Sequence, residues 1–197
     1  MKTIISFLLI ALITTSAFTA SAGTIADANF TMNISGQTLL LQTAQWNQSD
    51  LNVQIKDEEG RTIFDQTYKI TEATKIKKYN LSRLSEGTYK IVLSNELRTS
   101  KQNITKKDKG ILIDPTIETY FKPQISVLGK QLKVNYLNLD HQSTLKILDP
   151  NHETIYEALI DHPGYNQQFN LSKLDRGSYT LLVTQGNERF IHSFNLD

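Results

Sequence analysis

Two blocks of this sequence occur twice, about 90 residues apart. Residues 53–65 (VQIKDEEGRTIFD) resemble residues 145–157 (LKILDPNHETIYE), with four identical positions. Residues 80–94 (NLSRLSEGTYKIVLS) match residues 170–184 (NLSKLDRGSYTLLVT) even better, with six identical positions. A period of this length is too long for the unit of a solenoid and fits one small domain. The chain is therefore predicted to contain two copies of one fold.

The stretch between the copies sets the expected domain boundaries. Residues 106–116 begin with a polar run that ends in Gly110, a composition typical of a linker. We therefore predict one domain over residues 23–105 and a second over residues 117–197. The apolar residues 111–113 inside this linker are expected either to pair as a strand or to fill an interface between the copies.

Apolar and polar residues alternate in both copies. Leu, Val and Ile alternate with Asn, Gln and Lys in residues 51–56, and residues 87–93 and 132–136 follow a similar pattern. A period of two with one apolar face indicates a half-buried antiparallel sheet. About seven short strands are expected in each copy, in the first near residues 29–34, 38–43, 51–56, 61–69, 75–80, 87–94 and 98–104. Short strands of this spacing are typical of a β-sandwich or a barrel.

One short pattern narrows the choice to a kind of sandwich. In each copy a glycine stands two residues before a tyrosine that opens a strand: Gly87 before Tyr89, and Gly177 before Tyr179. This placement resembles the tyrosine corner of immunoglobulin-like sandwiches, whose hydroxyl binds a nearby backbone group. An ordinary strand aromatic is the alternative. We predict an all-β protein with two tandem immunoglobulin-like antiparallel β-sandwich domains, in which these four residues are structural.

Residues 1–22 have the order of an export signal. Lys2 precedes the apolar run of residues 4–13, and small residues ending in Ala20-Ser21-Ala22 follow. The run is too short to cross a hydrocarbon core about 30 Å thick, which takes roughly 20 residues. We therefore expect cleavage after Ala22 and export to the periplasm, the cell surface or the medium, without a membrane-spanning segment.

The composition excludes several classes of function. The chain has no Cys, which rules out disulfides, thiolate metal sites and a Cys nucleophile. Because Lys2 is the only charged residue among the first 22, the rest carries 20 basic and 20 acidic groups. Such a balance argues against nucleic-acid binding, which needs a basic surface.

Catalytic and metal-binding signals are weak. None of the four His residues is at ligand spacing from another, and no phosphate-binding loop or nucleophile elbow occurs. The acidic run Asp57-Glu58-Glu59 could contact Ca²⁺, but the second copy has Asp149-Pro150-Asn151 at this place. We expect no catalytic residue, no cofactor and no metal site.

Partner binding is expected at loops and sheet edges. Trp46, the only tryptophan, lies in a polar stretch at residues 45–50 and is a possible partner contact. Residues 161–167 form the other candidate loop, because they are less alike between the copies.

The repeated blocks resemble the C-terminal sorting domain of proteins secreted by the type IX system of Bacteroidota. Residues 55–63 match its strand and its turn with Asp and Gly-Arg, and residues 81–91 match its Leu-x-x-Leu-x-x-Gly-x-Tyr motif. The second copy keeps this motif but has His152-Glu153 where the first has Gly60-Arg61. The resemblance implies an immunoglobulin-like fold, present as a tandem pair, and a role in secretion.

Two classes of function follow. The first is a secreted or cell-surface, non-catalytic protein that serves binding or sorting, with a protein or surface component as partner. The alternative is a small sandwich-fold enzyme or an accessory domain acting on extracellular glycan. That alternative would need paired carboxylates or a cluster of His residues in a cleft, and two acidic groups ~5–10 Å apart in a pocket would favour it.

Overall fold

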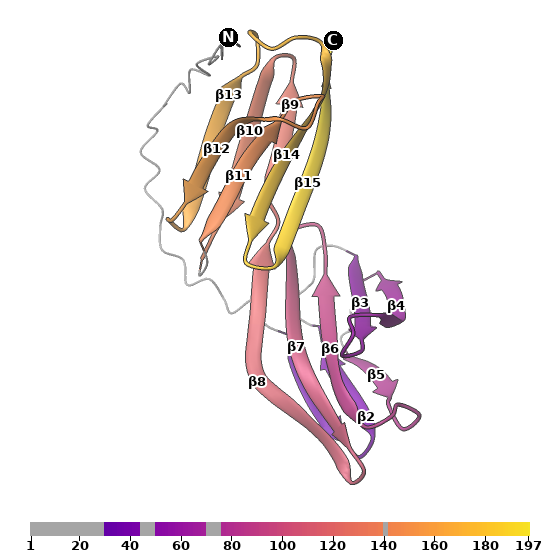
Figure 1. Cartoon of the computed structure of the whole chain (residues 1–197). Coiled ribbons are helices and arrows are strands. Elements are labelled where there is room, and N and C mark those ends of the chain that lie inside the picture. Colours follow the sequence, from indigo (N-terminus) through magenta and orange to yellow (C-terminus); the bar gives the residue numbers. More distant parts are fainter. Residues whose placement is uncertain (1–29, 44–49, 70–75, 140–141) are drawn as a thin grey trace, which may run out of the picture. The chain divides into compact units, whose positions relative to one another are not determined.

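The computed structural model describes residues 30–43, 50–69, 76–139 and 142–197. The expected export signal and Trp46 lie outside these residues. The described residues form β-strands and turns without a helix, and the chain divides into two compact units between Thr119 and Tyr120 (Figure 1). We call the unit up to Thr119 the first module and the unit from Tyr120 the second module.

The first module has two antiparallel sheets. One has the strand order β1-β2-β5 and the other the order β4-β3-β6-β7-β8 (Figure 1). The strands are β1 (Thr31–Ser35), β2 (Thr38–Gln42), β3 (Leu51–Lys56), β4 (Thr62–Tyr68), β5 (Ile76–Asn80), β6 (Gly87–Ser94), β7 (Arg98–Lys107) and β8 (Gly110–Phe121).

The second module repeats this topology with one strand fewer. Its sheets have the orders β13-β10-β9 and β12-β11-β14-β15. The strands are β9 (Gln124–Leu128), β10 (Gln131–Leu137), β11 (Ser143–Leu148), β12 (Thr154–Ile160), β13 (Gly164–Asn170), β14 (Gly177–Gln185) and β15 (Glu188–Leu196). Strands β9 to β15 thus correspond one by one to β1 to β7, which confirms the predicted fold class and the seven strands shared by the copies.

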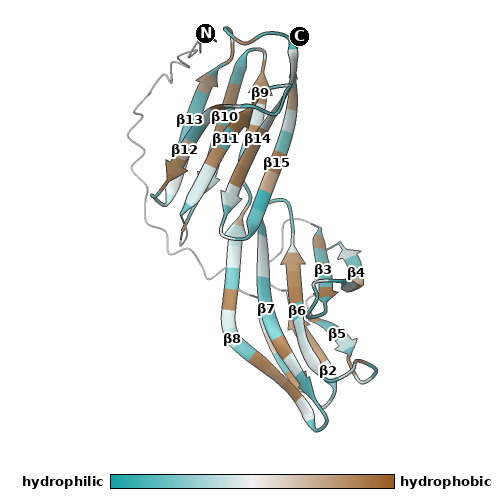
Figure 2. Cartoon of the chain, in the orientation of Figure 1, coloured by the Kyte–Doolittle hydropathy of each residue, from teal (hydrophilic) through white to brown (hydrophobic). Residues whose placement is uncertain are grey.

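Each module buries its apolar side chains between its two sheets. In β3 every second residue is buried, and β11 shows the same pattern. Figure 2 shows the resulting alternation of hydrophobic and hydrophilic bands along the strands. The core of the first module centres on Leu39, Leu41, Leu51, Val53, Ile91, Leu93 and Ile104. The core of the second centres on Leu132, Val134, Leu145, Ile147, Phe169, Leu181 and Val183.

The stretch expected to be a linker is a β-hairpin instead. Residues 106 and 107 end β7, residues 108 and 109 form the turn, and β8 returns beside β7. The linker was predicted from the polar composition of this stretch, but Lys106 is buried, with 7% exposure. Its Nζ donates a hydrogen bond to Gln37 Oε1 at 3.0 Å. Of the two options for residues 111–113, strand pairing is the one observed, and Ile111 joins the core of the first module.

Equivalent core substitutions test whether the modules are separate folding units. Ile91 and Leu181 occupy equivalent positions on β6 and β14, and both are fully buried. We expect Ile91→Ala and Leu181→Ala each to cost about 2–5 kcal/mol. In calorimetry of the full chain, each variant should shift a different one of two transitions. A single transition that shifts equally in both variants would show one cooperative unit.

Candidate functional site

The tyrosine after each repeated glycine forms the same hydrogen bond in both modules. The Tyr89 hydroxyl donates to the Ser85 carbonyl at 3.0 Å, and the Tyr179 hydroxyl donates to the Asp175 carbonyl at 2.9 Å. Both tyrosines are buried, at 8% and 4% exposure. Each bond therefore fixes the loop that precedes the strand to the strand itself.

The glycines beside these tyrosines have a backbone that suits no other residue well. Gly87 has a φ of 150° and Gly177 a φ of 157°. A Cβ atom on Gly177 would lie 2.6 Å from Cγ of Pro150, whereas the space beside Gly87 is open. Substitution of Gly177 is therefore opposed by both conformation and contact, and substitution of Gly87 by conformation alone.

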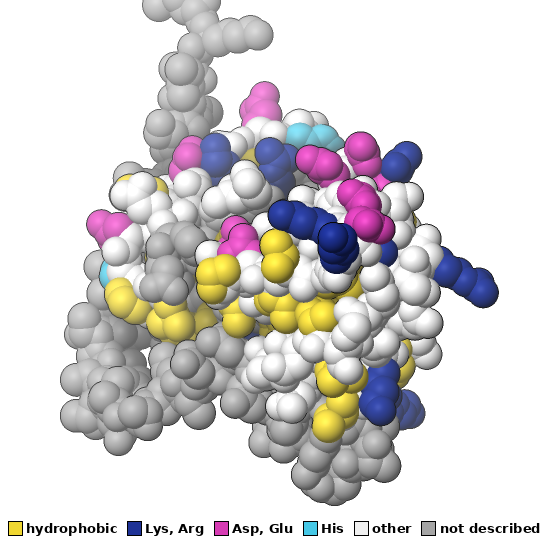
Figure 3. Space-filling model, turned by 90° about the horizontal axis from the view of Figure 1, so that it is seen from below, with side chains coloured by type: hydrophobic (Ala, Val, Ile, Leu, Met, Phe, Trp, Pro, Cys, Tyr) yellow, Lys and Arg dark blue, Asp and Glu magenta, His cyan; other side chains and the backbone are white. Residues whose placement is uncertain are grey.

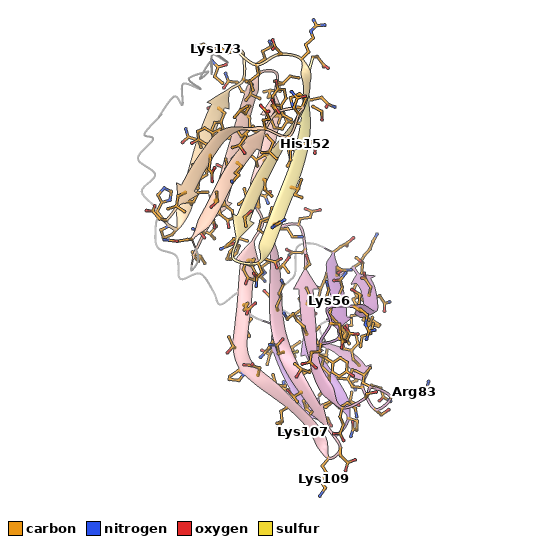
Figure 4. All side chains as sticks on the ribbon, in the orientation of Figure 1. Lys56, Arg83, Lys107, Lys109, His152 and Lys173 are labelled. Atoms are coloured by element: carbon orange, nitrogen blue, oxygen red, sulfur yellow. The ribbon has the colours of Figure 1, made fainter. Side chains whose placement is uncertain are left out.

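The loop before each tyrosine is capped in the same way. Asn80 Oδ1 accepts the N–H of Ser82 at 2.9 Å, and Asn170 Oδ1 accepts the N–H of Ser172 at 2.9 Å. These are Asx turns, in which a short polar side chain replaces a backbone acceptor. The loops carry Arg83 and Lys173 at equivalent exposed positions (Figure 4).

Removal of the tyrosine hydroxyls tests their role. We expect Tyr89→Phe and Tyr179→Phe each to lower the free energy of unfolding by about 1 kcal/mol, the typical net value of one hydrogen bond. Tyr165 provides the control, because its buried hydroxyl makes no hydrogen bond to the backbone; burial, with Tyr156 beside it, raises its pKa.

Tyr165→Phe should cost less stability than either of the other two substitutions, because the hydroxyl it removes holds no backbone group. Thermal and denaturant unfolding of the three variants provide the measurement. Equal effects of all three substitutions would contradict the tyrosine-corner interpretation.

An aspartate closes the β3–β4 turn and its counterpart between β11 and β12. The Asp57 carboxylate accepts the backbone N–H of Arg61 at 2.8 Å and the Arg61 Nε–H at 2.7 Å. Asp149 accepts the N–H groups of Asn151 and Glu153 at 2.8 and 2.9 Å. The described residues contain no group of three or more possible metal ligands. Asp57, and Glu59 through its contact with Arg61 Nη2 at 3.2 Å, thus serve the turn.

Arg61 lowers the pKa of Asp57 at this turn. Desolvation acts to raise the pKa of Asp57, but the hydrogen bonds and the charge of Arg61 outweigh it and hold this pKa below its ordinary value. A lowered pKa in the folded state means that the turn is stabilised at neutral pH. That stabilisation is lost as the pH falls from the ordinary carboxyl pKa through the lowered one.

The two turns differ at the residue with a left-handed backbone. Gly60 has a φ of 81°, and His152, which takes its place in the second module, has a φ of 63°. An L-residue is strained there by roughly 1–2 kcal/mol, and glycine is not. Figure 4 shows His152 at this turn.

Substitution of the residue with the left-handed backbone should have opposite effects on stability in the two turns. We expect Gly60→Ala to destabilise the protein by about 1 kcal/mol and His152→Gly to stabilise it by up to about 1 kcal/mol. Chemical denaturation of both variants measures the difference. A destabilised His152→Gly protein would show that the histidine side chain makes a contact that matters more than the backbone strain.

The second module contains a buried polar network that the sequence did not reveal. Ser143 Oγ donates to Asn138 Oδ1 at 3.0 Å, and Gln185 Nε2 donates to the same oxygen at 3.0 Å. Asn138 Nδ2 donates to the carbonyl of Ile160 at 3.1 Å. The first module has the apolar, fully buried Leu51 where the second has Ser143. The inward position of Ser143 on β11 is the sequence signal that could have indicated this network.

A shallow polar hollow lies on the outer face of β6, β7 and β8. Its lining residues are Lys90, Lys101, Gln102, Asn103, Asp114, Thr116 and Glu118. Asp114 and Glu118 are exposed, and Asp114 already accepts the N–H of Thr116 at 2.8 Å. A glycosidase needs one carboxyl in apolar surroundings, so that it stays protonated. The polar lining of this hollow does not provide such surroundings.

The predicted contact residues are placed only in part. Trp46 and most of the loop at residues 45–50 lie outside the described residues. Only residues 161–163 of the second candidate loop lie outside a strand, because β13 begins at Gly164. His162 stacks on Tyr165, with ring centroids 6.2 Å apart.

Basic and acidic side chains are interspersed on the face that Figure 3 shows. This mixture agrees with the near-neutral net charge of +1. No helix in the described part of the chain is long and apolar enough to cross a membrane.

Comparison with known families gives a match to the first module. Residues 28–107 match the family model of the secretion system C-terminal sorting domain, which confirms the resemblance seen in the sequence. The match covers β1 to β7 and ends before β8. Together with the immunoglobulin-like fold, it supports a secreted or cell-surface module without catalytic function.

Solved structures that match this chain include a biofilm associated protein and a chicken protein. One is described as "Biofilm associated protein - BSP domain", with 13% identity and a TM-score of 0.29, and the other comprises domains FN1–FN3 of chicken CNTN1, with 9% identity and a TM-score of 0.28. Each similarity covers 85% of this chain, which spans 29% of the first structure and 66% of the second. Comparison with curated proteins gives no match.

Proposed function

We propose that this chain is an exported, non-catalytic protein whose first module is recognised by a type IX secretion system and whose second module binds a protein partner. The observation that carries the proposal is the sorting-domain match over residues 28–107, which coincides with the seven strands shared by the modules. Residues 1–22 would direct the chain across the inner membrane first.

The two modules offer different surfaces to the secretion machinery. The β3–β4 turn of the first module presents Arg61, whose side chain is 75% exposed. The equivalent position in the second module is the exposed Glu153. We propose that a receptor of the secretion system distinguishes the modules by this difference of charge. Exposed charges at a turn contribute little to stability and much to binding specificity.

Cell fractionation tests the proposal on the intact chain. In cells with a functional type IX system, the chain should reach the cell surface or the medium, and in cells that lack the system it should stay in the periplasm. The same distribution in both strains would refute the proposal.

A matched pair of variants tests which module the secretion system recognises. Arg61→Glu should leave most of the chain in the periplasm, whereas Glu153→Arg should leave its export unchanged. Both substitutions lie on exposed turns, but Arg61→Glu also breaks the ion pair with Asp57, so unfolding curves of both variants provide the control. Normal export of Arg61→Glu would exclude the first turn as the feature that is recognised.

A further inference from the structure

Most outer strands of the described sheets carry a feature that hinders pairing with another chain. Strands β1 and β9 have only five residues each. Strand β5 carries Lys77 and Lys78, and the pairings of β4 and β12 contain a bulge. Strand β8 has Pro115 between Asp114 and Thr116. Short length, lysine, bulges and proline are the means by which proteins protect sheet edges.

Strand β15 lacks these features. It pairs with β14 over nine consecutive residues without a shift in register. Its nine residues, Glu188–Leu196, include no Pro and no Lys, and Glu188 and Arg189 stand together at its beginning. Strand β13 is also regular but shorter, with seven pairs. Strand β15 is therefore the longest unprotected edge that the described sheets present (Figure 1).

The first module shows how this fold uses the same edge. Strand β15 corresponds to β7, and β7 does not lie at an edge because β8 pairs with it. Side chains support this pairing: Ser100 Oγ and Thr119 Oγ1 are 2.9 Å apart, and Gln102 Nε2 donates to the Asp114 carbonyl at 2.6 Å. The fold thus accepts an additional antiparallel strand at the position that β15 leaves open.

The backbone of β15 presents a regular row of hydrogen-bonding groups at this edge. Gln185 and Glu188 pair directly across the two-residue turn between β14 and β15. The two residues of such a pair form both backbone hydrogen bonds with each other. Along an antiparallel ladder, these hydrogen-bonded pairs alternate with pairs whose residues form no backbone hydrogen bond with each other. The N–H and C=O groups of Arg189, Ile191, Ser193 and Asn195 therefore point away from β14.

The side chains of β15 indicate what the additional strand must supply. In the first module, the inward residues Ser100 and Gln102 of β7 are 0% and 7% exposed beside β8. Their counterparts Phe190 and His192 are only half-buried, although they lie on the same face as the buried Phe194. An additional strand with apolar residues at alternate positions would cover them, as Ile111, Ile113 and Ile117 of β8 pack on the first module's core.

We propose that the edge of β15 binds an extended segment of a partner protein, antiparallel to β15 and with β-branched apolar residues at alternate positions. This inference rests on the proposed function, since it names the site on the second module that the partner occupies. Backbone hydrogen bonds would supply the affinity, and the alternate apolar side chains the specificity.

A peptide with the sequence of residues 110–121 (GILIDPTIETYF) is the probe, because this segment already pairs with the equivalent strand β7. The labelled peptide is titrated into the full mature chain, with fluorescence anisotropy as the readout. A peptide with Asp at the positions of Ile111 and Ile113 is the matched control. We expect saturable binding of the first peptide and at least tenfold weaker binding of the second. Equal binding of both peptides, or none of the first, would overturn the proposal.

Two protein variants locate the binding at β15. Ile191→Pro removes an outward N–H without removing a hydrogen bond to β14, and it should weaken binding at least tenfold. Ile191→Thr keeps the backbone donors and should bind within about threefold of the unaltered chain. Full affinity of a folded Ile191→Pro chain would overturn the proposal.

Hydrogen exchange keeps the test valid if Ile191→Pro does not fold. In the unaltered chain, the peptide should slow exchange of the outward amides of Ile191, Ser193 and Asn195. Protection confined to the first module would overturn the proposal. Sedimentation of the chain without peptide gives a further test. A dimer that forms in the unaltered chain and is lost in Ile191→Pro would overturn the proposal, because the edge would then bind a second copy of this chain.

These measurements use purified protein and are independent of export. Peptide binding together with failed type IX export would reject the proposed function and leave the β15 site in place. Normal export without peptide binding would reject only the β15 site.

Discussion

The crossing from one sheet to the other is the constraint on which each module depends. In the first module, β5 belongs to the three-stranded sheet and β6 to the five-stranded one, so residues 81–86 must connect two layers. Four hydrogen bonds hold this connection: Ser82 N–H to Asn80, Leu81 N–H to Gln37, Leu84 N–H to Leu81 and the Tyr89 hydroxyl to Ser85. All four have an equivalent in the second module. These bonds therefore hold the two layers together at the same place in both modules.

The modules share this frame but differ at the edges of their sheets. Strand β8 extends the larger sheet of the first module to five strands, while the larger sheet of the second has four. Additional polar residues are buried with β8, among them Ser100 and Gln102. One fold thus occurs twice in the chain, once with its last edge covered and once with that edge open. Repetition of a fold does not imply repetition of its binding surface.

The sequence predicted the fold well because two signals coincided. The period-two alternation placed the strands, and the repeated Leu-x-x-Gly-x-Tyr motif indicated how the sheets are connected. The hairpin at residues 106–116 was missed because burial of Lys106 depends on Gln37, which lies 69 residues earlier in the chain. The network around Asn138 was missed for the same reason, since Gln185 and Ile160 reach it from distant strands. Local composition carries no information about such partners.

One aromatic pair differs between the modules in a way that bears on folding fidelity. Phe64 packs edge-on against Tyr79 in the first module, and Tyr156 packs edge-on against Phe169 in the second. The tyrosine of the pair therefore lies on β5 in the first module and on β12 in the second. Tyr79 finds its hydrogen-bond partner in Tyr68, 3.4 Å away, and the second module has Ile160 at the position of Tyr68.

Neighbouring domains of similar sequence are prone to exchange strands while they fold. If β5 took the place of β13, the Tyr79 hydroxyl would be buried beside an apolar side chain, at a cost of about 1–3 kcal/mol. The different position of this hydroxyl would therefore favour the pairing of β5 with the strands of its own module.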